Sequence, residues 1–142
     1  CDEAAYDMKQ ALVAHIQALG YEVEDFGTYD AKPLLYPDVA FEVAQAVSAG
    51  RVDRGVLVCG TGIGVAISAN KVPGVRAAQA HDTYSAERAR KSNDAQIVTM
   101  GARVIGIELA KVIVETFLSN EFSGGSSQAK VDRIAAYERD GR

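Results

Sequence analysis

The stretch that decides the fold is GVLVCGTGIG, residues 55–64, in which a short apolar run leads directly into a glycine-rich turn. A continuous apolar run such as 55–59 is typical of a strand that is covered on both faces of a parallel sheet. The glycines that follow turn the chain into an expected helix near 65–70. Strand, glycine turn and helix in immediate succession predict an α/β fold with a loop that can hold a ligand.

Strand and helix patterns alternate on both sides of this stretch. Helices are expected at 5–19, 39–50, 83–91, 107–118 and 129–139, and strands at 21–26, 76–80 and 97–100, with a loop at 27–38 and a linker at 123–128. This alternation predicts a parallel sheet with helices on both faces. A further strand before Asp2, which we expect to be missing from the chain, would bring the sheet to about five strands.

The composition limits the class of protein. The 142 residues are 48% apolar and 24% charged, which predicts one globular domain over 1–142. No apolar run approaches the ~20 residues of a membrane span, so we expect a cytoplasmic protein without a membrane partner. A net charge of −4 argues against nucleic acid, and two cysteines and two histidines argue against a disulfide framework or a zinc site. We expect no metal and no cofactor.

Ligands of such sheets bind at the carboxyl ends of the strands. This rule predicts that one rim of the molecule carries six residues, namely Asp2, Cys59, Gly60, Thr61, His81 and Gly101.

The glycine loop 60–64 is expected to present backbone N–H groups that attract an anion. It lacks the lysine of a nucleoside triphosphate loop and the spacing of a dinucleotide fingerprint. On its own, the loop leaves two interpretations open: a glycine turn above an inert buried cysteine, or a reactive thiol at a ligand site.

The surrounding sequence carries more information. DRGVLVCGTGIGVAISANKVPGVRAA (53–78), HDTYSAERARKSNDAQIVTMGARVIGIELAK (81–111), YEVEDFGTY and YPDVA together resemble the ribose 5-phosphate isomerase B family, which also contains galactose 6-phosphate isomerases. The resemblance implies a Rossmann-like three-layer α/β/α domain that forms homodimers or homotetramers with shared active sites. It also implies metal-independent proton transfer between C1 and C2 of a sugar phosphate through a cis-enediolate.

The resemblance also implies roles for the residues that react. Cys59 stands where the cysteine-using branch of the family has its catalytic base, and N–H groups that stabilise a thiolate make a thiol competent for that task. Thr61 matches the residue that moves or shares a proton at the enediolate oxygens. The N–H groups of Gly60, Gly62 and Gly64, together with the side chain of Asn93, would stabilise the negative charge.

Other matching residues would bind the substrate. Asp2 aligns with an acidic residue that contacts sugar hydroxyls, and Arg103 matches an arginine that binds phosphate. Lys130, in a tail helix within 123–142 that is expected to pack on a neighbouring subunit, stands near a second phosphate-binding position. His81, at a strand end, is a candidate substitute base, although a structural role is the commoner one for a lone histidine.

Three positions depart from the family pattern and bear on the substrate. Glu3 and Ser92 each stand where the family has a histidine, and the histidine that Ser92 replaces is credited with opening a furanose ring. Ser126 lies in a tail that departs from the family pattern. A sugar 4-phosphate with four carbons needs no ring opening, so an isomerase of D-erythrulose 4-phosphate is an alternative, as is an isomerase of unphosphorylated sugars. A sugar-phosphate-binding module without turnover, or redox sensing by Cys59 with Cys1, also stays open.

Overall fold

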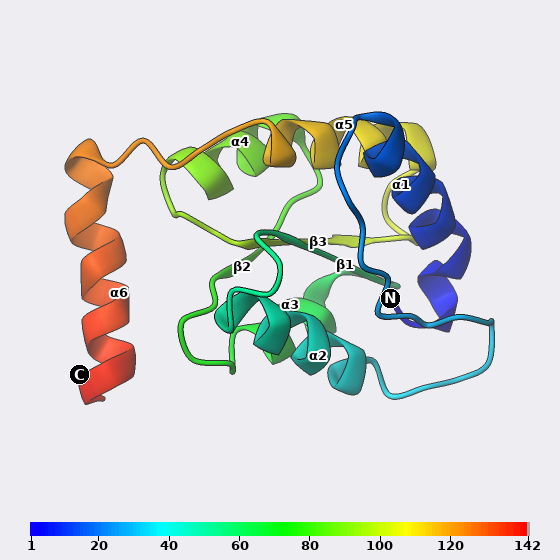
Figure 1. Ribbon diagram of the computed structural model, residues 1–142, viewed down its shortest axis with the longest axis horizontal. Helices are drawn as coiled ribbons and strands as arrows, with labels where there is room; N and C mark the ends of the chain where they lie inside the picture. Colours follow the sequence, from blue (N-terminus) through cyan, green and yellow to red (C-terminus); the bar gives the residue numbers. More distant parts are fainter. Residues whose placement is uncertain (142) are drawn as a thin grey trace.

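The structure is a computed structural model that describes residues 1–141, and it contains one parallel sheet with helices on both faces (Figure 1). The strands are β1 (Gly55–Cys59), β2 (Ala77–Gln79) and β3 (Ile97–Gly101). Their order in the sheet is β1-β3-β2, so β3 is central and pairs with both neighbours. The predicted α/β class with a parallel sheet is confirmed.

Helices form the two outer layers of the fold (Figure 1). One layer contains α1 (Tyr6–Ala18), α4 (Thr83–Lys91) and α5 (Ile107–Leu118), and the other contains α2 (Tyr36–Ser48) and α3 (Ile63–Ala69). Two 3-10 turns, Glu3–Ala5 and Gly125–Ser127, precede α1 and the final helix, α6 (Gln128–Asp140). No helix within residues 1–141 is long and apolar enough to cross a lipid bilayer.

Each layer of helices encloses its own apolar core. Side chains of the sheet alternate between the two, so Val58 and Val98 pack toward α1, α4 and α5, whereas Leu57, Cys59 and Ile97 pack toward α2 and α3. Because both faces of the sheet are covered, nearly every residue of β1 has to be apolar. This is why the run at 55–59 identifies a central element of the fold.

The number of strands differs from the prediction of about five, since three are present in the described residues. The segment 21–26 alternates like a strand but stays unpaired. A groove of about 690 Å³ is lined by residues of both segments, among them Val23 and Val56. Cys1 and Asp2 bridge this groove at one end only: the N–H of Asp2 donates to Val58 O, and Thr28 donates to Cys1 O.

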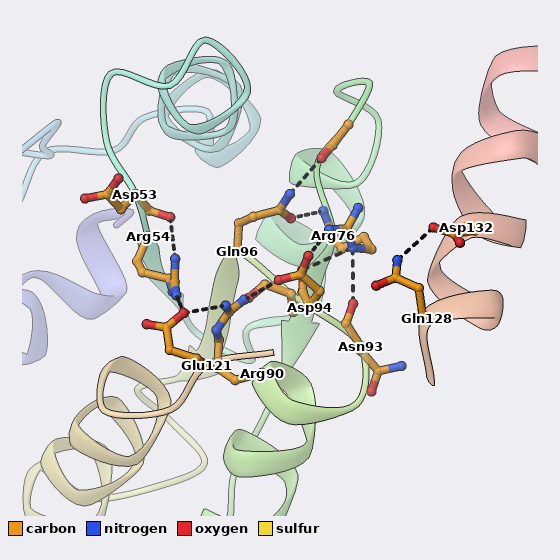
Figure 2. Close-up of polar contacts among 12 residues, drawn as sticks. Asp53, Arg54, Arg76, Arg90, Asn93, Asp94, Gln96, Glu121, Gln128 and Asp132 are labelled. Atoms are coloured by element: carbon orange, nitrogen blue, oxygen red, sulfur yellow. Dashed lines mark hydrogen bonds and ion pairs between the residues drawn. The ribbon is translucent and has the colours of Figure 1, made fainter. Parts of the chain in front are cut away.

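An ionic network ties together the amino ends of the three strands, and Figure 2 shows it. The carboxylate of Glu121 accepts a hydrogen bond from Arg54, which precedes β1. The same carboxylate oxygen, Oε2, lies 3.5 Å from Nη2 of Arg90. Asp94, which lies before β3, accepts from both Arg90 and Arg76, and Arg76 directly precedes β2. The guanidinium of Arg90 is buried, and this burial lowers its pKa while Asp94 opposes the shift. This network fixes the end of the sheet that lies away from the glycine loop.

The last helix, α6, stands to one side of the domain (Figure 1). Val131 is its buried residue, whereas Ile134 and Tyr137 are exposed. Its carboxyl-terminal half is attached through Glu138, whose carboxylate accepts the N–H of Gly74 over 2.9 Å. An amphipathic helix with exposed apolar side chains is suited to covering a further surface.

Candidate active site

Cys59 is the last residue of β1, and its thiol is almost completely buried beneath the glycine loop. Its Sγ accepts a hydrogen bond from the N–H of Gly62 over 3.1 Å. Gly62 has a φ of +78°, a conformation that L side chains avoid, and this conformation lets the chain turn back over the sulfur. An N–H that points at sulfur stabilises the thiolate, which is the form of cysteine that accepts a proton.

The loop lies against the end of β3, backbone on backbone. A Cβ on Gly62 would lie 2.7 Å from the carbonyl carbon of Met100, and one on Gly101 would lie 2.7 Å from the carbonyl carbon of Thr61. The buried hydroxyl of Thr99 donates to Gly62 O over 2.8 Å and holds the two segments together. The position of the loop over Cys59 therefore depends on two glycines and one buried threonine.

Thr61 is exposed at the crest of the loop. Its Oγ1 accepts the N–H of Ile63, which leaves the hydroxyl hydrogen available to another acceptor, and Gln79 Nε2 donates to its carbonyl oxygen over 2.7 Å. The N–H groups of Gly60 and Gly64 have no acceptor among residues 1–141. Because α3 is only 7 residues long, these individual N–H groups contribute more to the attraction of an anion than the helix dipole does.

Asp2 lies beside the end of β1 as predicted. Its Oδ1 is buried and has no hydrogen-bond partner among the described residues. Burial, and then the negative charge of Glu3, raise the pKa of the Asp2 carboxyl above its usual range. A buried oxygen without a partner is costly in a folded protein, and a hydroxyl group of a ligand would supply the missing donor.

Arg103 lies on the same rim, next to the start of the loop. A Cβ on Gly60 would be 3.5 Å from Cδ and Nη1 of Arg103, and the N–H of Arg103 donates to Gly60 O over 3.0 Å. The guanidinium is exposed and forms no ion pair within residues 1–141. It is therefore free to bind an anion beside Cys59.

His81 also reaches the rim, but its ring has a structural partner. Its Nε2 accepts the N–H of Gly101 over 2.9 Å, so this nitrogen has no lone pair left for a substrate proton. The prediction that His81 contacts substrate stays a prediction, with Nδ1 as the atom concerned.

The resemblance implies that the side chain of Asn93 acts together with the loop over Cys59, but the structure does not bring Asn93 and Cys59 together within one chain. Asn93 lies between α4 and β3, at the amino end of the sheet, where its carbonyl accepts Arg76 Nε over 3.1 Å (Figure 2). The five residues of β3 place on the order of 15 Å between the two ends of the sheet. The topology separates these residues because α4 carries the chain from the rim back to the opposite end. Ser92 lies at the same end as Asn93.

Lys130 is likewise remote from Cys59 within one chain. It is exposed on α6, which is held at Gly74, just before β2. The structure thus brings together Asp2, Gly60–Gly64 and Arg103 around Cys59 and places Asn93 and Lys130 elsewhere.

Three residues at the site, namely Thr99, Gln79 and Tyr36, were not singled out by their sequence pattern. Thr99 could have been found, because it is the one polar side chain in the apolar strand 97–101. Gln79 and Tyr36 act through contacts between segments distant in sequence, and no local spacing reveals them.

Comparison with known proteins shows the family of the chain. The sequence profile of the Ribose/Galactose Isomerase family matches residues 1–134. "Ribose-5-P isomerase B" of Listeria innocua is 53% identical over 142 residues, which span 100% of this chain and 96% of that protein. "D-erythrulose-4-phosphate isomerase" of Pectobacterium atrosepticum is also 53% identical, over 96% of this chain and 91% of that protein.

A solved structure shows the same fold. The ribose-5-phosphate isomerase B of Clostridium thermocellum superposes with a TM-score of 0.96 at 43% identity, covering 99% of this chain and 95% of that one. The family match, the identities and the shared fold all lead to one conclusion: the chain belongs to the ribose/galactose isomerase family, whose type B ribose 5-phosphate isomerases it resembles over its whole length.

Proposed function

We propose that this protein interconverts an aldose phosphate and the corresponding ketose phosphate, with Cys59 as the base. The observation that supports this proposal most directly is the hydrogen bond from Gly62 N–H to Cys59 Sγ, at the bottom of a loop flanked by Asp2 and Arg103. A thiol that accepts an N–H, unpaired N–H donors and an exposed guanidinium are the groups that such a reaction needs.

In the first step, the Cys59 thiolate removes the proton from the carbon next to the substrate carbonyl. The electrons of the broken C–H bond form a carbon–carbon double bond, and the carbonyl electrons move to its oxygen, which gives an enediolate. Return of the proton to the neighbouring carbon, together with transfer of a hydroxyl proton between the two oxygens, completes the isomerisation. Thr61 is suited to the transfer between oxygens because its hydroxyl hydrogen is not used within the loop.

Other groups bind the substrate and stabilise the charge. The free N–H groups of Gly60 and Gly64 would donate to the enediolate oxygens, where negative charge develops. Asp2 Oδ1 would accept a hydrogen bond from a sugar hydroxyl, and Arg103 would bind the phosphate. These interactions hold the open-chain sugar with the reacting carbons near Sγ.

We further propose that the active site is shared between subunits of a homodimer or homotetramer in the cytoplasm. Asn93 and Lys130 lie far from Cys59 of their own chain, and α6 presents exposed Ile134 and Tyr137. A symmetric dimer that places the amino end of one sheet near the carboxyl end of the other would bring both residues to a neighbour's glycine loop.

The leading substrate is ribose 5-phosphate, by similarity to the relatives named above. A specific residue favours a second candidate: Ser92 stands where the family has a ring-opening histidine. D-erythrulose 4-phosphate cannot close a furanose ring because it has no fifth carbon, and D-erythrose 4-phosphate cannot because its fourth oxygen is esterified, so an enzyme for this pair needs no such histidine.

The test is a coupled assay of the wild type on both sugar phosphates, followed by hydrogen-isotope exchange at C2 with Cys59→Ser and Cys59→Ala. Loss of a general base is expected to slow exchange about 10²- to 10⁴-fold while the fold is retained. Near-normal exchange in a folded Cys59→Ala protein would show that another group is the base. Binding without turnover by the wild type would instead favour a binding module.

A further inference from the structure

The ring of Tyr36 lies directly on the glycine loop. Tyr36 is the first residue of α2, and Gly64 lies in the first turn of α3. A Cβ added to Gly64 would be 2.5 Å from Cε2 and 2.6 Å from the hydroxyl oxygen of Tyr36. Only a glycine leaves room for the ring in this position, so the ring forms one wall of the loop that covers Cys59.

The hydroxyl group of Tyr36 is left without a partner in the part of the chain that the structure describes. It forms no hydrogen bond within residues 1–141, and 38% of the residue is exposed. The hydroxyl of Tyr29, by contrast, donates to Asp25 O over 2.8 Å. A phenol that is fixed against a loop and keeps its hydroxyl free is placed to bind a ligand.

Glu3 connects the segment before Tyr36 to the rest of the site. Its Oε2 accepts the N–H of Leu34 over 3.3 Å, and Leu34 lies two residues before Tyr36. Glu3 also directly follows Asp2, the residue with the unpaired buried oxygen. One hydrogen bond thus ties the loop that leads into α2 to the residue beside Asp2.

We propose that the hydroxyl of Tyr36 donates a hydrogen bond to the substrate oxygen that becomes negatively charged, and that Glu3 is a positioning residue that acts through Tyr36. This inference rests on the proposed isomerase function. The oxygens of the reacting carbons are expected beside the free N–H of Gly64, and the Tyr36 hydroxyl lies next to that residue. A donor held there before the reaction stabilises charge that forms only in the transition state.

The first experiment compares Tyr36→Phe with Tyr21→Phe. Phenylalanine keeps the ring on Gly64 and removes only the hydroxyl, so the fold is retained. Tyr21 is a matched control, since it is 43% exposed and lies in the unpaired segment beside the groove. We expect Tyr36→Phe to lower kcat roughly ten- to a hundredfold with KM changed less than about threefold, and Tyr21→Phe to leave both constants unchanged.

The second experiment tests Glu3 with two substitutions. Both Glu3→Gln and Glu3→Ala remove the charge that acts on Asp2, but only glutamine keeps an oxygen that can accept the N–H of Leu34. We expect Glu3→Ala to lower kcat about as far as Tyr36→Phe, and Glu3→Gln to restore most of the loss. In the Tyr36→Phe background, Glu3→Ala is expected to cost less than about twofold more, because both changes remove the same interaction.

The outcomes separate the inference from the function on which it rests. An active wild type with an unchanged kcat in Tyr36→Phe overturns the role of the hydroxyl. If the losses of kcat from Tyr36→Phe and Glu3→Ala multiply in the double variant, Glu3 does not act through Tyr36. If Glu3→Gln does not restore kcat, the positioning role of Glu3 is likewise overturned. A wild type that turns over none of the phosphorylated tetroses, pentoses and hexoses overturns the proposed function, and the inference with it.

Discussion

The N–H of Gly62 donates to the sulfur of Cys59, and the α-carbon of the same glycine lies against the backbone of Met100. One residue therefore combines two demands: it needs a positive φ to direct its N–H at sulfur, and it has no space for a side chain. The chemistry of Cys59 and the packing of the loop on β3 cannot be changed independently at this position.

Gly62→Ala is expected to lower both stability and activity. An alanine at this position would have to adopt the left-handed conformation, which costs about 1–2 kcal/mol. Its Cβ would also collide with the backbone of Met100, which costs roughly 1–3 kcal/mol. Gly50→Ala is the control, because Gly50 has a φ of +74° and nothing within 4 Å of its Cβ. Urea denaturation should show only the conformational cost in Gly50→Ala. Equal losses of stability in the two variants would contradict the collision.

Mixed oligomers offer a test of the shared site. If Cys59 and Asn93 of one site come from different chains, then Cys59→Ala and Asn93→Ala subunits complement each other when they are expressed together. Half of randomly formed dimers would be mixed, and each would contain one intact site of two, so about a quarter of the wild-type activity should return. Co-expressed Cys59→Ala and Thr61→Ala subunits serve as the control and should recover none. No recovery in the first mixture would place Asn93 outside the site of a neighbour.

Asp2→Asn is expected to separate stability from function. The pKa of Asp2 is raised in the folded protein, so folding favours the protonated carboxyl, and this contribution is lost as the pH rises through the folded pKa. At pH 7 the ionised carboxylate therefore destabilises the fold, and Asp2→Asn should be more stable than the wild type. This advantage should shrink as the pH falls through the raised folded pKa and should be gone below the unfolded value of 3.8, while turnover at pH 7 is reduced. A variant that is less stable at pH 7 would refute the burial of an unpaired charge.

The buried Arg90, at the centre of the network at the amino ends of the strands, should contribute strongly to stability. Arg90→Leu removes the partner of Asp94 and the donor to Ala95 O, and we expect a loss of about 3–5 kcal/mol, as for other buried pairs. Arg51→Leu breaks the exposed pair with Glu24 and should cost less than about 1 kcal/mol. Chemical denaturation of both variants measures the difference, and similar losses would mean that burial of Arg90 has no special effect.

The elements that local patterns determine were predicted well. The helices α4 and α5 lie where their apolar spacing and flanking residues place them, and the run at 55–59 is β1. The segment 21–26 shows the limit of such patterns, because alternation of side chains makes a strand possible but only a neighbouring backbone makes it form.

The candidate site was predicted where it follows from one loop and its strand end. Cys59 and Gly60 lie together as expected from the rule for parallel sheets, and Arg103, which the family resemblance indicated, lies beside them. Asn93 lies away from Cys59 of its own chain because a residue that follows a helix returns to the opposite end of the sheet. Tyr36 was missed because its contact with Gly64 joins two helices, and the sequence between them does not show where they meet.

The hydrogen bond from Arg76 to the carbonyl of Asn93 has a genetic consequence if the site is shared as proposed. The network that stabilises one chain would then position a residue in the active site of its partner. In a mixed dimer, a substitution at Arg76 would impair the site whose Cys59 comes from the wild-type chain and spare the site whose Cys59 comes from the mutant chain, so activity would fall in proportion to the share of mutant chains. The defect would therefore be expressed in the neighbour and not in the chain that carries the substitution.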